Sequence, residues 1–169
     1  MDSMKYQRSF SRNVIDSRIL NALEIIVGYL GSKDLHWTVM GSLSLALQGV
    51  HINPKDIDIL TDEQGALQIG ALLEEYEVEP INFSRTEVFE SHYGLYFIEG
   101  VKVEVMGNLR VQVDGKWVPL SSGLKFPLFV QQNSLNIPVS PLRDQLLFYE
   151  QLGREKDIET ILKIREVLK

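Results

Sequence analysis

The chain has 169 residues, with 17 Lys plus Arg against 23 Asp plus Glu, three His and no Cys, and 44% of it is hydrophobic. This length and apolar content predict one compact domain that buries roughly 70% of the surface of its unfolded chain, and they exclude a disordered protein. The lack of cysteine excludes a disulfide scaffold, a thiolate nucleophile and a metal site with cysteine ligands, and it fits a reducing compartment.

Membranes and long nucleic acids are also poor candidates for partners. No run approaches the ~18 apolar residues of a membrane span, and the first residues, MDSMKYQRSFSRN, lack the apolar stretch of a secretory signal, so we expect a cytoplasmic protein. The formal net charge of −6 argues against a nucleic-acid partner, because binding its backbone requires a basic surface. If the protein handles phosphate, the composition favours a single nucleotide accompanied by a divalent cation.

The first elements predicted from the N-terminal side are a helix, a strand and a second helix. Apolar residues recur at helical spacing over residues 13–30, and Gly31 follows where a C-cap would lie. Residues 36–40 read as a short buried strand. It ends at Gly41-Ser42, after which a helix runs to about residue 49.

A second strand is predicted over residues 56–60, where acidic and isoleucine residues alternate. Asp56 and Asp58 therefore share one face of this strand, and the isoleucines share the other. At ~3.3 Å per residue the two aspartates stand about 6.6 Å apart along the strand, so both can converge on one cation. Carboxylate and phosphate oxygens are the ligands that Mg²⁺ prefers.

The middle of the chain reads as strands. After a helix over 62–75, capped by Thr61 or Asp62, the segments VEPINFS, HYGLYFIE, VKVEVMG, LRVQVDG and KWVPL follow one another, and Asp114-Gly115 is typical of a two-residue hairpin turn. Glu104 is flanked by valines in its segment, so its side chain points away from them and supplies a third acid.

Two helices, 141–152 and 155–168, are predicted at the end of the chain, separated by Gly153. No repeat, low-complexity tract or Pro/Ser-rich linker interrupts residues 1–169, which predicts a single domain. The fold class we expect is α/β (α+β), with a mixed sheet flanked by helices and a C-terminal helix pair.

Each of these features also has a purely structural interpretation. An alternating acidic strand is often a solvated sheet face, and Gly41-Ser42 can be an ordinary helix N-cap. The order of the features favours function, because a glycine at a strand-to-helix turn lets backbone approach a ligand, and the amides at the following helix start can hold phosphate oxygens.

The segments Trp37-Thr-Val-Met-Gly-Ser42, Asp56-Ile-Asp58-Ile-Leu60 and Val103-Glu104-Val105 resemble the nucleotidyltransferase superfamily, which includes DNA polymerase beta and aminoglycoside and lincosamide nucleotidyltransferases. The small bacterial single-domain members are the most similar. The motif core covers about residues 35–107, and the hairpin and helices 108–169 follow it. A weaker likeness lies in Gly153-Arg-Glu-Lys-Asp157, although charges at a helix start often act only as caps.

The resemblance implies that Gly41 and Ser42 hold the phosphates of a nucleoside triphosphate, and that Asp56 and Asp58 ligate Mg²⁺ or Mn²⁺. It implies that Glu104 completes the site as a metal ligand or as the base that deprotonates the acceptor. The third acid in relatives is more often Asp, and a lysine that often precedes the Gly-Arg pair is replaced here by Tyr149-Glu-Gln151.

Two lysines are further candidates for nucleotide binding. Lys55 precedes the acidic strand in the loop 51–55, where it either contacts phosphate or is simply solvated. Lys102 shares the face of Glu104, so it either pairs with that acid or reaches the nucleotide.

The function that we expect is transfer of a nucleoside monophosphate from Mg-NTP, such as ATP, to a hydroxyl of a small molecule or protein. One alternative is a toxin-like enzyme that modifies a macromolecule, and another is a catalytically inactive member that binds a nucleotide or a partner. A homodimer that completes the acceptor pocket is a further hypothesis.

Overall fold

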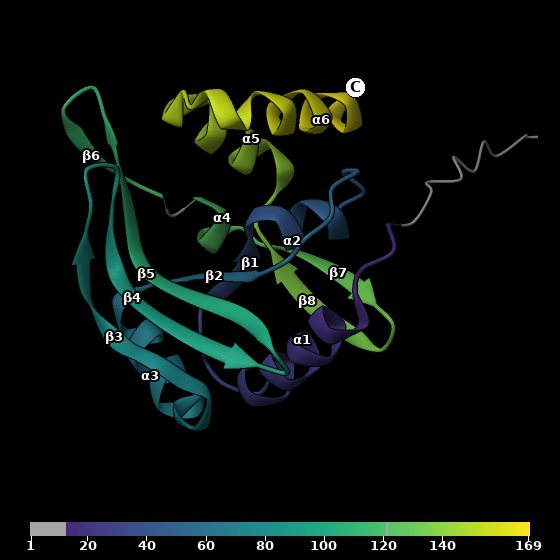
Figure 1. Cartoon of the computed structure of the whole chain (residues 1–169), viewed down its shortest axis with the longest axis vertical. Coiled ribbons are helices and arrows are strands. Elements are labelled where there is room, and N and C mark those ends of the chain that lie inside the picture. The colour runs from purple at the N-terminus through teal and green to yellow at the C-terminus, as the bar shows by residue number, and fades with distance from the viewer. Residues whose placement is uncertain (1–12, 121) are drawn as a thin grey trace, which may run out of the picture.

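A mixed sheet of eight strands with helices on both faces forms the described part of the chain, residues 13–120 and 122–169 of this computed structural model (Figure 1). The predicted fold class is confirmed. The helices are α1 (Ser17–Leu30), α2 (Gly41–Leu47), α3 (Glu63–Leu72), α4 (Ser122–Lys125), α5 (Leu142–Leu152) and α6 (Ile158–Leu168). The strands are β1 (Trp37–Met40), β2 (Ile57–Thr61), β3 (Glu77–Arg85), β4 (Phe89–Ile98), β5 (Val101–Val113), β6 (Lys116–Pro119), β7 (Leu128–Gln132) and β8 (Leu135–Val139).

The strand order places β2 at the centre of the sheet. The order is β3-β4-β5-β2-β1-β8-β7, and β6 pairs with β5. β2 runs antiparallel to β1 and parallel to β5, so its two neighbours come from well-separated parts of the chain. α1 and α3 lie on one side of this sheet, and α5 and α6 lie together on the other (Figure 1).

The larger core lies between the sheet and α1 and α3. Alternate residues of β2 and of the first half of β5 face it, and these apolar side chains are fully buried: Ile57, Ile59, Val103 and Val105. Burial of each such side chain contributes roughly 1.5–3 kcal/mol, which holds the two parallel strands in place. The alternate residues of the same strands, including the acids, point to the opposite face.

The helix ends follow local chemistry. α3 is capped by Asp62, whose Oδ1 accepts a hydrogen bond from the Gly65 amide at 2.6 Å. This decides between the two predicted caps. Gly153, with φ of 59°, ends α5 in the left-handed conformation that glycine adopts without strain. A 3-10 turn over Glu155–Asp157 then precedes α6, so that helix begins later than predicted.

The structure adds two features that the sequence patterns do not show. β7 and β8 form a hairpin in a stretch without a predicted element, and β8 pairs in parallel with β1. The two predicted segments VKVEVMG and LRVQVDG form the single strand β5, which continues through Asn108 although its φ is 52°. None of the helices in the described part of the chain is long and apolar enough to cross a membrane. The polar segment weighed as a signal lies, apart from Asn13, outside the described residues.

The close approach of α3 to β5 gives a first prediction. A Cβ at Gly107 would lie 2.7 Å from the Ala66 Cβ and 2.7 Å from the Asp62 carbonyl oxygen. Gly107→Ala should therefore lower the free energy of unfolding by about 1–3 kcal/mol, measured by urea denaturation. Gly28, exposed on α1 with nothing within 4 Å of a new Cβ, is the matched control. Gly28→Ala should raise the same quantity by about 0.5–1 kcal/mol. Equal effects would show that α3 does not pack this closely.

Candidate active site

A cleft of about 520 Å³ opens on the sheet face opposite α1 and α3. Asp58 and Glu104 line it, and Gly41 lies at the turn beside them. Tyr149 of α5 and Arg154, which follows α5, contribute to its wall. The β3–β4 hairpin also lines it, so the cleft is built from five segments of the chain, and it contains two of the three predicted acids.

The parallel register of β2 and β5 brings four charged side chains onto one face. Asp58 pairs directly with Glu104, and Ile57 pairs with Val103. Asp56 and Lys102, the residues just before that second pair, lie on the same face as Asp58 and Glu104. The Lys102 Nζ lies 3.6 Å from Asp56 Oδ2 and 3.6 Å from Glu104 Oε1. The site therefore holds three carboxylates and one ammonium group side by side.

Asp58 is the most perturbed acid of this group. Burial raises its pKa from 3.8 to about 7, and a hydrogen bond with Glu104 and the charges of Glu104 and Asp56 act in the same direction. The charge of Lys102 opposes these effects. Near neutral pH, Asp58 therefore gains or loses a proton readily, and a cation beside it would favour the ionised form.

Two tyrosines face the same acids. The Tyr93 hydroxyl donates a hydrogen bond to Glu104 Oε1 at 2.8 Å, and burial followed by this bond raises the pKa of Tyr93. Burial raises the pKa of Tyr149 to about 12, and the charge of Asp58 adds to the effect. Both phenols stay protonated at neutral pH and can only donate to, or accept from, a bound molecule as neutral groups.

The turn at Gly41 approaches Asp58 more closely than a side chain would permit. Gly41 has φ of 70°, and a Cβ there would collide with Asp58 Oδ2. The Gly41 amide donates to Gln145 Oε1 at 2.9 Å, while Gln145 Nε2 donates to the Ser44 hydroxyl and the Ser140 carbonyl, both at 2.8 Å. Gln145, which is 3% exposed, thus ties α5 to the turn, and sequence patterns do not indicate this role.

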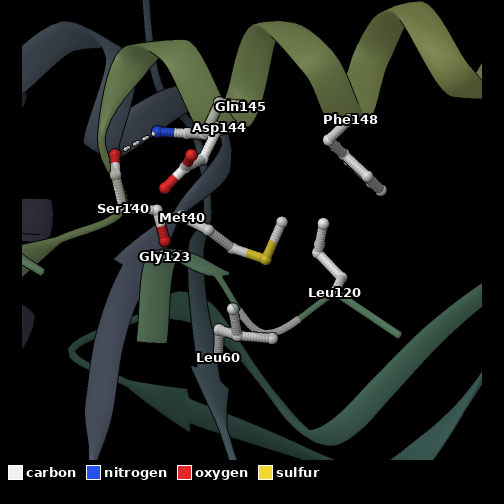
Figure 2. Close-up of a pocket in the computed structure, with 8 residues that line it drawn as sticks. All are labelled: Met40, Leu60, Leu120, Gly123, Ser140, Asp144, Gln145 and Phe148. Carbon is white, nitrogen blue, oxygen red and sulfur yellow. Dashed lines mark hydrogen bonds between the residues drawn. The ribbon is translucent and has the colours of Figure 1, made fainter. Parts of the chain in front are cut away.

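Figure 2 shows the small cavity of about 10 Å³ behind this turn. Gln145 and Ser140 lie at its polar end, with their hydrogen bond dashed, and Met40 and Phe148 lie at its apolar end. The cavity is far smaller than the cleft and lies between α5 and the strand end that precedes the Gly41 turn. Met40 and Phe148 also line the cleft, so the two cavities share part of their wall.

The other predicted nucleotide ligands are placed differently. Ser42 is half-buried in the first turn of α2. Lys55 is exposed and lines a separate cavity with Asp16 and Arg18. Its role in nucleotide binding stays a prediction, as do the roles of the other site residues.

The C-terminal Gly-Arg-Glu-Lys-Asp segment, in contrast, reaches the cleft. Arg154 and Lys156 both line it. Arg154 Nε donates to the buried Asp157 at 2.6 Å, and its guanidinium lies 5.7 Å from the centre of the Phe89 ring. The sequence signal for these two residues was the weak likeness in this segment.

The donor chemistry of the cleft fits a divalent cation in part. Within the described ranges, no group of three His, Cys, Asp or Glu side chains is arranged to hold a metal ion. The adjacent carboxylates of Asp58 and Glu104 nevertheless match the one or two protein carboxylates that Mg²⁺ usually takes. Asp56 is turned to Lys102 instead.

Comparison with known proteins places this geometry in a family. The family model of aminoglycoside-2''-adenylyltransferases matches residues 22–164. The chain belongs to that family. A comparison with curated proteins gives no match.

Solved structures agree with this assignment. A Thermotoga maritima protein, a nucleotidyltransferase by assignment only, is 38% identical, with a TM-score of 0.80 over 89% of this chain and 94% of its own. The antibiotic-resistance factor ANT(2'')-Ia is 11% identical, with a TM-score of 0.61 over 92% of this chain and 86% of its own. The lincomycin-bound lincosamide adenylyltransferase LnuA is 15% identical, with a TM-score of 0.57 over 92% of this chain and 99% of its own. The last two likenesses show the fold.

The raised pKa of Asp58 predicts how stability depends on pH without metal. Below pH ~4 the carboxyl is protonated in both states, but as the pH rises the unfolded chain ionises first, while the folded protein holds the proton until its pKa of about 7. Between pH ~4 and pH ~7 the free energy of unfolding of the wild type should thus fall by on the order of 2–4 kcal/mol relative to that of Asp58→Asn. Above pH ~7 the difference should stay constant. Urea denaturation in EDTA across this range measures the difference.

The exposed loop residue Asp34 serves as the control for this experiment, since Asp34→Asn removes the same charge at a position that is not buried. Its difference from wild type should stay nearly constant with pH. Asp58 faces Asp56, Glu104 and Lys102, and both proteins keep these three side chains. A constant difference for Asp58→Asn as well would contradict a buried, repelled carboxyl.

Gln145 gives a third prediction. Gln145→Met keeps the size of the side chain but leaves the Gly41 amide and the Ser140 carbonyl without this partner. The free energy of unfolding should fall by about 2–4 kcal/mol, because buried polar groups lose their hydrogen bonds. Gln151→Met, at an exposed position of the same helix, should change it by less than about 0.5 kcal/mol. Chemical denaturation of both variants checks this, and equal stabilities would remove Gln145 as a support of the turn.

Proposed function

We propose that the protein transfers a nucleoside monophosphate from Mg-NTP to a hydroxyl of a small molecule. The observation that carries the proposal is the direct pairing of Asp58 with Glu104 in the cleft, beside the close Gly41 turn. Membership of an adenylyltransferase family supports it. A bound divalent cation would supply charge stabilisation for the phosphates and the departing pyrophosphate.

Asp58 and Glu104 are the residues that would hold that cation, and Asp56 would join them once Lys102 releases it. The acceptor hydroxyl attacks the α-phosphorus, the bond to pyrophosphate breaks, and the hydroxyl proton passes to a base. Glu104, whose Oε1 accepts a hydrogen bond from Tyr93, would serve as that base where it does not ligate the cation. Proximity in the cleft contributes most of the rate enhancement.

The lining of the cleft offers groups that suit both substrates. Arg154 and Lys156 line it from the C-terminal segment, where cationic groups favour phosphates. Ser84, Thr86 and Ser91 line it from β3, β4 and the turn between them, where hydroxyl groups suit a polar uncharged acceptor. The volume of about 520 Å³ lies in the usual range for small-molecule sites. ANT(2'')-Ia and LnuA are described with tobramycin and lincomycin, which makes a small hydroxylated acceptor the best model.

A catalytically inactive binding protein of the same fold is the second candidate. Two contacts favour it: Gln145 occupies the Gly41 amide that was expected to face phosphate, and Lys102 lies between two of the acids. A protein acceptor or a macromolecular target, as in a toxin, would need a surface beyond the cleft. A homodimer and a cytoplasmic location are further parts of the proposal.

The test is a transfer assay with each of the four α-³²P-labelled NTPs, with Mg²⁺ or Mn²⁺, in the presence of pooled small hydroxylated acceptors. Wild-type protein should release pyrophosphate and label one acceptor, whereas Asp58→Asn should lower the rate by a factor of about 10³ or more, because a charge that stabilises the transition state is lost. Asp34→Asn is the matched control and should keep the full rate. Binding of labelled NTP without transfer would favour the inactive binding protein, and neither binding nor transfer would overturn both functions.

A further inference from the structure

We propose that Lys102 is a built-in counter-ion of the acidic cluster, whose ammonium occupies the place of a divalent cation and must leave before the cation binds. This inference rests on the proposed function, since it concerns the same site. In this role the ammonium of Lys102 competes with the metal ion for the carboxylates. A lysine that binds phosphate, or one that is only solvated, would not compete with the metal ion.

The position of the ammonium supports the assignment. Nζ is equally far, 3.6 Å, from an oxygen of Asp56 and an oxygen of Glu104, which belong to two different strand segments. Lys102 is 38% exposed and Glu104 is 26% exposed, so the contact lies at the rim of the cluster and not in bulk solvent. Glu104 also lines the cleft that holds Asp58, so the ammonium contacts a carboxylate that would ligate the cation.

The register of the strands leaves Lys102 little choice of partner. Because β2 and β5 run parallel with Ile57 beside Val103, residues 56 and 102 lie next to each other at the same end of the pair. Alternation then sets Glu104 on the same face, one pleat away. An ammonium at this corner meets a carboxylate on its own strand and another on the neighbouring segment.

Charge makes occupancy by the ammonium and by a metal mutually exclusive. A divalent cation held by Glu104, with Asp58 and then Asp56 as further ligands, would stand within a few ångströms of Nζ and repel it. A lysine has a long flexible stem and three rotatable donors, so its head can swing away from the carboxylates without a backbone change. Lys102 thus keeps the acids together without metal. It lowers the apparent affinity for metal, because its contacts with Asp56 and Glu104 must break before the metal binds.

The experiment measures Mn²⁺ affinity and metal-free stability without nucleotide. Lys102→Met removes the ammonium and keeps the stem, so Mn²⁺ titration followed by electron paramagnetic resonance should show about three- to tenfold tighter binding than wild type. In EDTA the same variant should melt about 2–4 °C lower, because the repulsion between Asp56 and Glu104 is no longer screened. Lys102→Gln, a second neutral variant, should also bind Mn²⁺ more tightly.

Lys116→Met is the matched control, since it removes an exposed lysine at the β5–β6 turn and changes the net charge equally. Its Mn²⁺ affinity and melting temperature should equal those of wild type. Wild-type affinity in both neutral Lys102 variants, or weaker binding in them, would overturn the inference. Failure of NTP transfer with a preserved difference in Mn²⁺ affinity would overturn the proposed function alone. Failure of every protein to bind Mn²⁺ would overturn both.

Discussion

The parallel pairing of β2 with β5 is the constraint on which the site depends. Its register sets Asp58 directly beside Glu104, an arrangement of like charges that disfavours folding when both are ionised. The other face of the same two strands buries Ile57 and Val103 completely. Apolar burial of several such side chains exceeds the cost of one repelled carboxylate, so the core holds the acids in a position that they would not adopt alone.

The helices behind the cleft add a second, polar constraint. Gln145 on α5 binds the Gly41 amide and the Ser140 carbonyl, and both ends of its amide group are therefore used. A side chain with both donor and acceptor satisfied has one orientation, which fixes the distance between α5 and the turn. Because Tyr149 is on the same helix and lines the cleft, the contacts of Gln145 also fix the position of that wall of the cleft. Stability and the shape of the site are coupled here through a residue that touches neither phosphate nor acceptor in the proposed reaction.

Local chemistry made α1, β1, β2 and the C-terminal helices predictable from the sequence, because periodicity and caps act within a few residues. The β7–β8 hairpin was not predictable in this way, since β7 is an edge strand with exposed Leu128 and Phe129 and its turn has Asn133 in the left-handed conformation instead of a glycine. Arg154 shows the same limit at the site. Its sequence context suits a helix cap as well as a phosphate ligand, and only the packing of α5 against the sheet brings it to the cleft.

Lys102 shows where a strand pattern stops being informative. Alternation alone places it on the face of Glu104, but the partner on the next strand depends on register, which is a property of the pair. If β2 were shifted by one residue against β5, Ile57 or Ile59 would face Glu104, and the aspartates would turn into the apolar core between the sheet and α1. That core excludes the shifted register, because it would have to bury two charges and expose two isoleucines. The hydrophobic side of the sheet therefore decides which carboxylates the lysine meets on the polar side.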